Sequence, residues 1–289
     1  MPTIQVNESV TPLIILFHGL SSSPLELNYI SNVLKKNGFR VETPTLKGYG
    51  FGDYAATWEE WLNEATNLVS TLQKKEATQL SVGGISLGAT LALGVAEKLD
   101  GINAVICLST TLIYNGWASP WYRILTRLGI WLGLGEKFKY KERDPFGIKN
   151  IQIRAHIKKV MAQQNISEVG GSYMTLNHIA QADNLCAYVR KNLTNVTASV
   201  LAIHAVDDEV AHPNNVDLLF KHISSPIKRA IYLGNSYHMI TIDNERETVA
   251  YESVAFLREI YNQSTNAKIR EKIISPELQR FLRLEKSNQ

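Results

Sequence analysis

Cysteine is scarce in this chain, and so are long apolar runs and any large excess of one charge. Only Cys107 and Cys186 are cysteines among 289 residues, which argues against a disulfide framework and favours reduced thiols. The start of the sequence has no basic patch followed by an apolar stretch, so no secretory signal is predicted and a cytoplasmic location is expected. The formal net charge of +3 gives no electrostatic case for binding nucleic acid.

Linkers and metal-binding clusters are missing as well. No Gly-, Ser- or Pro-rich stretch separates two cores, which favours one domain with an insertion over two small domains. No cluster of Cys, His, Asp and Glu suggests a metal site, so neither a metal nor another cofactor is expected. Residues 265–289 hold six Lys or Arg against three Glu, which accounts for the whole positive excess.

Apolar segments of strand type and of helix type alternate along most of the chain. Strands are predicted over residues 13–17, 39–43, 80–82, 104–108, 200–204 and 230–233. Helices are predicted over residues 24–37, 57–75, 89–99, 214–223 and 244–261. This alternation predicts an α/β fold in which helices cover both faces of a mostly parallel sheet.

One pentapeptide, Gly84-Ile85-Ser86-Leu87-Gly88, lies at a junction of a predicted strand and a predicted helix. A serine in such a turn adopts a strained backbone conformation, and its close packing requires glycine two residues away on each side. The serine hydroxyl is then free at the start of a helix, whose unpaired N–H groups favour developing negative charge. Ser86 is therefore the candidate nucleophile; a strand-to-helix turn without any chemistry is the alternative.

A serine nucleophile needs a base, and that base needs a carboxylate to orient it. Three acids, Asp207, Asp208 and Glu209, follow one predicted strand, and His238 follows the next. The chain order of serine, acid and histidine is that of α/β-hydrolases. His204 is a weaker candidate base because it precedes the acids in their own loop. One residue of register decides which acid points inward, so Asp208 and its alternate Asp207 both stay open at this point.

Four segments resemble those of α/β-hydrolases of the small-lid carboxylesterase and monoacylglycerol lipase type, a group often described as serine aminopeptidase S33-like or lysophospholipase-like. They are Leu16-Phe17-His18-Gly19-Leu20, Lys47-Gly48-Tyr49-Gly50, Gly84 to Gly88, and Asn235 to Thr241. The resemblance covers about residues 13 to 261. It implies an α/β-hydrolase fold with a small helical lid and no cofactor. Because the first apolar strand starts near Leu13, about seven strands are expected and not the eight of larger members.

The resemblance also implies roles for individual residues. The catalytic residues would be Ser86, Asp208 and His238, and the segment that starts at Asp208 is similar to the acid loop of bacterial carboxylesterases. The backbone N–H groups of Leu20 and Leu87 would form the oxyanion hole, which stabilises the negative charge of the acyl-transfer intermediate.

The strand and helix alternation stops where this fold carries its lid. The predicted organisation is a first part of the core over 1–109, a helical lid over 110–195, a second part of the core over 196–263 and a basic tail over 264–289. Trp117, Trp121 and Leu125 in the lid are expected to bind the substrate. Two interpretations of this apolar stretch stay open, because it either covers only the active-site cleft or also contacts a lipid membrane surface.

These features together predict a serine hydrolase that cleaves small-molecule carboxylic esters with a hydrophobic, short-to-medium acyl chain. A thioesterase acting on acyl-CoA or acyl-carrier protein needs the same three side chains and is the alternative enzyme. A non-catalytic ligand-binding module of the same fold is the alternative from another class. The tail is expected to form a short helix that packs on the body, joins two subunits as a homodimer or stays mobile.

Overall fold

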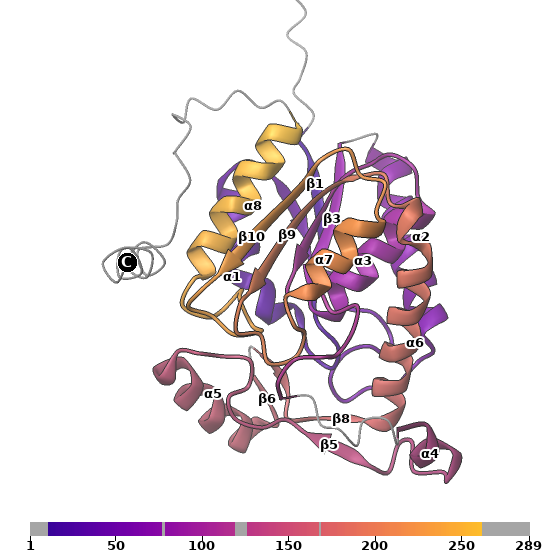
Figure 1. Cartoon of the computed structure of the whole chain (residues 1–289), viewed down its shortest axis with the longest axis vertical. Coiled ribbons are helices and arrows are strands. Elements are labelled where there is room, and N and C mark those ends of the chain that lie inside the picture. Colours follow the sequence, from indigo (N-terminus) through magenta and orange to yellow (C-terminus); the bar gives the residue numbers. More distant parts are fainter. Residues whose placement is uncertain (1–10, 77–78, 119–125, 168, 262–289) are drawn as a thin grey trace, which may run out of the picture.

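The computed structural model of the chain describes residues 11–76, 79–118, 126–167 and 169–261. Its centre is a six-stranded sheet with the order β10-β9-β4-β3-β1-β2, in which every pairing is parallel (Figure 1). The strands are β1 (Leu13–Phe17), β2 (Arg40–Glu42), β3 (Leu80–Ile85), β4 (Ile102–Leu108), β9 (Ser199–Ala205) and β10 (Lys228–Leu233). All six predicted strands are present, and the described residues contain no seventh strand of this sheet.

The residues of β1 alternate between two separate hydrophobic cores. Leu13, Ile15 and Phe17 belong to one core, and all three are at most 1% exposed. Ile14 and Leu16 belong to the other core and are 0% exposed. Because successive side chains of a strand point to opposite faces, a strand that is apolar at every position must be covered on both sides.

Helices form a layer on each face of the sheet (Figure 1). One layer consists of α1 (Asn28–Lys36) and α8 (Arg246–Ile260), which contribute to the core with Ile14 and Leu16. The other layer consists of α2 (Trp58–Glu76), α3 (Leu87–Lys98), α6 (Leu176–Asn192) and α7 (Asn214–His222). The predicted helix over 24–37 begins with a separate 3-10 turn, η1 (Pro24–Leu27). These layers confirm the predicted α/β fold class.

The segment between β4 and β9 contains short strands besides its helices. It holds α4 (Thr126–Trp131), α5 (Ile151–Gln164) and two antiparallel pairs, β5 (Lys139–Lys141) with β8 (Tyr173–Thr175) and β6 (Ile166–Ser167) with β7 (Gly170–Gly171). A helical insertion was expected, but strands of two or three residues are too short to produce a periodic signal. The last helix of the segment, α6, packs against α2 and α3 beside the sheet, whereas the other elements lie below the sheet in Figure 1.

The loops that follow β1, β3, β9 and β10 meet at one edge of the sheet. The carboxyl ends of parallel strands lie on the same side, and a crevice opens where the strand order reverses. The reversal lies between β1 and β3, because β2 is added beyond β1 while β4, β9 and β10 are added beyond β3. The loop that begins at His18 and the turn at Ser86 flank this crevice, with Asp208 and His238 following β9 and β10.

Candidate active site

Ser86 lies in the turn between β3 and α3, with φ of 58° and ψ of −123°. The positive φ confirms the strained serine conformation predicted for this turn. A Cβ atom on Gly84 would lie 2.5 Å from the carbonyl oxygen of Phe17, and one on Gly88 would lie 2.3 Å from the same oxygen. Since real Cβ atoms essentially never approach closer than 3.0 Å, both positions need glycine for the turn to pack against the end of β1.

Replacement of Gly88 by alanine is expected to lower the free energy of unfolding by about 1 to 3 kcal/mol, because the methyl group would force the nucleophile turn away from β1. Urea denaturation followed by circular dichroism measures this change. Gly234→Ala is the matched control, since a Cβ atom there meets nothing within 4 Å. An unchanged denaturation midpoint for Gly88→Ala would contradict the close packing of this turn.

Ser86, His238 and Asp208 form a continuous hydrogen-bonded series. The Ser86 hydroxyl donates to Nε2 of His238 at 2.8 Å, and Nδ1–H of His238 donates to the Asp208 carboxylate at 2.8 and 2.9 Å. Asp208 is 2% exposed and His238 is 4% exposed. The structure therefore brings together the three side chains that the sequence predicts as nucleophile, base and acid.

Asp208 receives hydrogen bonds from several directions besides His238. The N–H groups of Val210 and Ala211 donate to Oδ1 at 2.9 and 2.8 Å, and Nε2 of His204 lies 3.2 Å from Oδ2. Burial by itself raises the pKa of Asp208, but the charge of His238 and the hydrogen bonds from both histidines outweigh it and hold that pKa well below its usual range. The carboxylate therefore stays ionised, and Nε2 of His204 contacts Asp208 and the Ala211 carbonyl oxygen.

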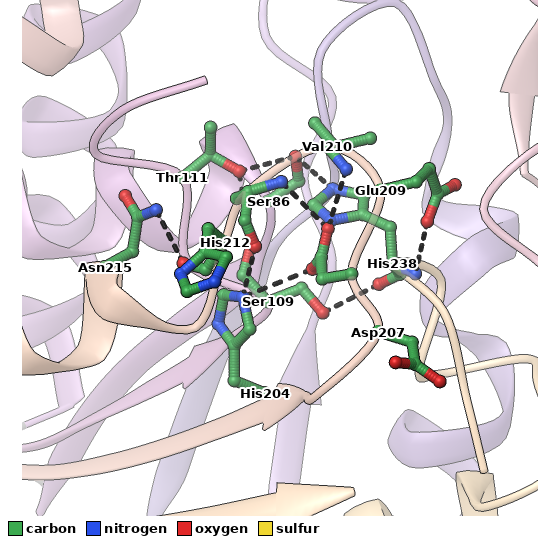
Figure 2. A network of polar contacts seen from close by, with 12 residues as sticks. Ser86, Ser109, Thr111, His204, Asp207, Glu209, Val210, His212, Asn215 and His238 are labelled. Atoms are coloured by element: carbon green, nitrogen blue, oxygen red, sulfur yellow. Dashed lines mark hydrogen bonds and ion pairs between the residues drawn. The ribbon is translucent and has the colours of Figure 1, made fainter. Parts of the chain in front are cut away.

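The backbone of His238 is held at both of its polar groups (Figure 2). Its N–H donates to the Glu209 carboxylate at 3.1 Å, and its carbonyl oxygen accepts a hydrogen bond from the Ser109 hydroxyl at 2.7 Å. Burial lowers the pKa of His238, but the charge of Asp208 and its hydrogen bond outweigh this effect and raise the pKa above 6.5. Glu209 thus positions the histidine backbone, whereas Asp208 orients the imidazole ring.

Asp207 belongs to a different cluster of polar groups. Its side chain is 54% exposed and lies 2.7 Å from Nζ of Lys149, and Figure 2 shows it apart from the hydrogen bonds around His238. The Asp207 carbonyl oxygen accepts from Nε1 of Trp117 at 3.2 Å. The two acids that sequence register left open therefore have different surroundings, and only Asp208 contacts His238.

The two backbone donors expected for the oxyanion hole lie close to Ser86. Leu87 is the first residue of α3, so its N–H has no acceptor within the helix. Leu20 lines the same cavity as Ser86 and His238. Among the described residues, the neighbouring N–H of Gly19 donates to Glu26, whereas no hydrogen bond engages the N–H of Leu20.

A cavity of about 590 Å³ opens over Ser86 and His238, which is the size of a small-molecule site. Most of its lining residues come from 114–179 in the segment between β4 and β9. The apolar and aromatic residues of this part of the lining are Tyr114, Ala118, Leu134, Phe138, Tyr140, Pro145, Phe146, Met161, Val169, Met174, Leu176 and Ile179. Glu26, Glu142, Asp144 and Glu209 add four carboxyl groups to the wall, and Arg143 adds a positive charge.

Trp117, which the sequence analysis expects to bind the substrate, is not among the residues that line this cavity. Its side chain is 62% exposed and packs edge-on against Tyr237, with ring centroids 5.9 Å apart. The hydrogen bond from its Nε1–H to the Asp207 carbonyl holds the indole outside the cavity. Trp121 and Leu125, the other two residues expected to bind the substrate, lie outside the described residues, as does the tail over 264–289.

Sequence reasoning missed Glu26, which is 2% exposed and lines the cavity. An acid in the first turn of a predicted helix is typical of solvent-exposed positions, so the sequence contains no signal for this burial.

Within the described ranges no group of three or more His, Cys, Asp and Glu could hold a metal ion. The helices described there include none with the length and apolar character that crossing a membrane requires.

Comparison with known proteins places the chain in a family. The model of the family described as serine aminopeptidase, S33 matches residues 8–246. The thermostable monoacylglycerol lipase of Bacillus sp. (strain H-257) is 24% identical over 246 residues, which cover 84% of this chain and 89% of that protein. The carboxylesterase of Bacillus subtilis (strain 168) is 20% identical over 257 residues, which cover 86% of this chain and 92% of that protein.

Solved structures support the same fold. The monoacylglycerol lipase of Paleococcus ferrophilus matches with a TM-score of 0.70 at 18% identity, over 87% of this chain and 97% of that one. A soluble variant of the monoglyceride lipase of Saccharomyces cerevisiae, in complex with a substrate analogue, matches with a TM-score of 0.72 at 16% identity, over 90% of each chain. Because the family model spans more than half of the sequence, the chain belongs to the serine aminopeptidase S33 family of α/β-hydrolases, which confirms the resemblance of its four segments.

Proposed function

We propose that this protein hydrolyses carboxylic esters of small molecules through an acyl-enzyme on Ser86. The observation that carries the proposal is the hydrogen-bonded series of Ser86, His238 and Asp208 beneath a largely apolar cavity. The names of the relatives, monoacylglycerol lipase and carboxylesterase, support esters with a hydrophobic acyl chain. The apolar lining favours a short-to-medium chain, with a monoacylglycerol as one candidate substrate.

The geometry suits two successive acyl transfers. His238 Nε2 accepts the proton of Ser86 as the serine oxygen attacks the ester carbonyl, and the ionised Asp208 stabilises the resulting imidazolium. The N–H groups of Leu20 and Leu87 would donate to the oxyanion that forms. The imidazolium then gives its proton to the leaving alcohol, and water hydrolyses the acyl-enzyme by the same steps.

Two assays test this proposal and separate it from its alternatives. A fluorophosphonate probe should label the folded wild-type protein at Ser86, whereas absence of labelling would favour a non-catalytic ligand-binding module. A series of p-nitrophenyl esters from acetate to laurate, compared with the matching acyl-CoA thioesters, then measures kcat/KM for each substrate. A consistent preference for thioesters would replace the esterase by the thioesterase alternative.

The pH dependence of kcat/KM is expected to have an acid limb with its midpoint above pH 6.5. Only the neutral imidazole accepts the Ser86 proton, so activity should fall as the pH drops through the pKa of His238, which the Asp208 charge raises above 6.5 despite the opposing effect of burial. Measurement of kcat/KM between about pH 5 and 9 locates this limb. A midpoint at or below 6.5 would contradict the raised pKa of His238, whereas absence of any acid limb would contradict the assignment of His238 as the base.

A contact with a lipid surface is a finer proposal about the segment between β4 and β9. Trp131 at the end of α4 is 80% exposed, and the adjacent Leu132 is 57% exposed. Exposed Trp and Leu side chains suit the interfacial region of a membrane, which supports such a contact. The homodimer expected through the tail stays a prediction about residues outside the described ranges.

A further inference from the structure

Glu26 is a buried carboxyl group beneath the loop that follows β1, and the catalytic steps above do not use it. It is 2% exposed, and no ion pair with Lys or Arg involves it in the described part of the chain. Burial raises the pKa of Glu26 to about 7, although hydrogen bonds from Gly19 and Ser22 and the charge of His238 each lower it. A buried carboxyl group without a cationic partner normally destabilises a fold, so its place beside Ser86 calls for a functional explanation.

Both oxygens of the Glu26 carboxyl group accept hydrogen bonds from this loop. The backbone N–H of Gly19 donates to Oε1, and the Ser22 hydroxyl donates to Oε2 at 2.5 Å. A Cβ atom on Gly19 would lie 3.2 Å from Oε1 of Glu26 and 3.7 Å from Cβ of Ser86. The Glu26 carboxyl group therefore lies against the part of the loop that is closest to the nucleophile.

Hydrogen bonds with the side chains of Glu26, Tyr49 and His18 fix two consecutive peptide groups of this loop. The peptide between His18 and Gly19 is held at both ends, because the Tyr49 hydroxyl donates to the His18 carbonyl at 3.0 Å and the Gly19 N–H donates to Glu26. The next peptide is held through the Gly19 carbonyl, which accepts from Nδ1 of His18 at 2.7 Å. Since the C=O and N–H of a planar trans peptide point in opposite directions, the N–H of Leu20 points away from the His18 ring.

We propose that Glu26 is a positioning residue for ester hydrolysis. Its carboxyl group holds the N–H of Gly19, so that the next peptide group directs the Leu20 N–H at the carbonyl oxygen of an ester bound at Ser86. This role rests on the proposed function. Glu26 does not touch the reacting atoms, and it acts through the Gly19 peptide. Preorganised donors lower the barrier because they need no reorientation as the oxyanion forms.

Four variants test this role. Glu26→Ala removes the acceptor, and Glu26→Asp keeps a carboxyl group but withdraws it by one methylene. Glu26→Gln keeps an oxygen that can accept from Gly19 and an amide that can donate to Ser22. Glu64→Ala is the matched control, because that carboxylate also accepts a loop N–H, from Lys47 at 3.1 Å, but lies outside the cavity.

We expect Glu26→Ala to lower kcat for a p-nitrophenyl ester by about 10²-fold with little change in KM, as for loss of an oxyanion donor. Glu26→Asp should lose activity in the same way to a smaller extent, Glu26→Gln should recover most of it, and Glu64→Ala should match wild type. The affinity for a trifluoromethyl ketone, which forms a tetrahedral oxyanion on serine, should fall in parallel with kcat. Binding of the product carboxylic acid should not change, which separates positioning from general damage to the cavity.

Wild-type kcat in folded Glu26→Ala, or in Glu26→Asp if the alanine variant does not fold, would overturn this role. Equal losses in Glu26→Gln and Glu26→Ala would overturn it as well, because the amide preserves the acceptor geometry. These results leave wild-type ester hydrolysis and fluorophosphonate labelling intact. Absence of both in the wild-type protein would instead overturn the proposed function, and the role of Glu26 with it.

Discussion

Replacement of Ser86 by alanine is expected to lower kcat for ester hydrolysis by about 10⁶-fold, the loss found when a serine nucleophile is removed from such a catalytic unit. Alanine keeps the Cβ atom, so the turn between β3 and α3 and its contacts with β1 should persist. The loss therefore comes from the missing hydroxyl that donates to His238 at 2.8 Å. Fluorophosphonate labelling and p-nitrophenyl ester hydrolysis measure this effect, with circular dichroism to check the fold.

Ser81→Ala is the matched control for this experiment. Ser81 lies on β3, the strand that precedes the turn, is 0% exposed and has its hydroxyl hydrogen-bonded to that of Tyr261, away from the cavity. We expect its loss to affect stability and to leave kcat close to wild type. More than about one hundredth of wild-type kcat in pure Ser86→Ala would mean that another group is the nucleophile, because a residual rate that high exceeds what binding and oxyanion stabilisation supply.

Replacement of Asp208 by asparagine is expected to lower kcat by about 10⁴-fold, although the two side chains have nearly the same shape. The asparagine amide can donate to Nδ1 of His238, which would place the imidazole proton on Nε2. In that tautomer Nε2 cannot accept the proton of Ser86, and the negative charge that stabilises the imidazolium is also lost. Steady-state kinetics with a p-nitrophenyl ester measures the loss in kcat.

Asp207→Asn is a stringent control, because it makes the same chemical change one residue earlier. The Asp207 side chain is 54% exposed and paired with Lys149, and exposed ion pairs typically contribute only about 0 to 1 kcal/mol. We expect kcat and KM to stay close to wild type. A large loss in Asp207→Asn together with near-normal activity of Asp208→Asn would show that the acid assignment is shifted by one residue.

The secondary structure could be predicted from local patterns, and the reasons are physical. Apolar runs such as Leu13 to Phe17 must be covered on both faces, which predicts central strands of a parallel sheet. Gly84 and Gly88 mark a turn whose packing excludes any Cβ atom, so the position of Ser86 was visible in the sequence. The exceptions were β5 to β8, whose two or three residues give no periodic signal.

By itself, the sequence determined the α/β class, the order of the strands along the chain and the positions of Ser86 and His238 after two of those strands, because these depend on residues that are neighbours in the chain. Only the tertiary structure decided that Asp208 and not Asp207 meets His238, and that Trp117 lies outside the cavity. It also decided that Glu26 is buried against Gly19. Each of these outcomes depends on which side chains come into contact from loops that are distant in the sequence. Local periodicity does not encode the hydrogen bonds and the burial that result from such contacts.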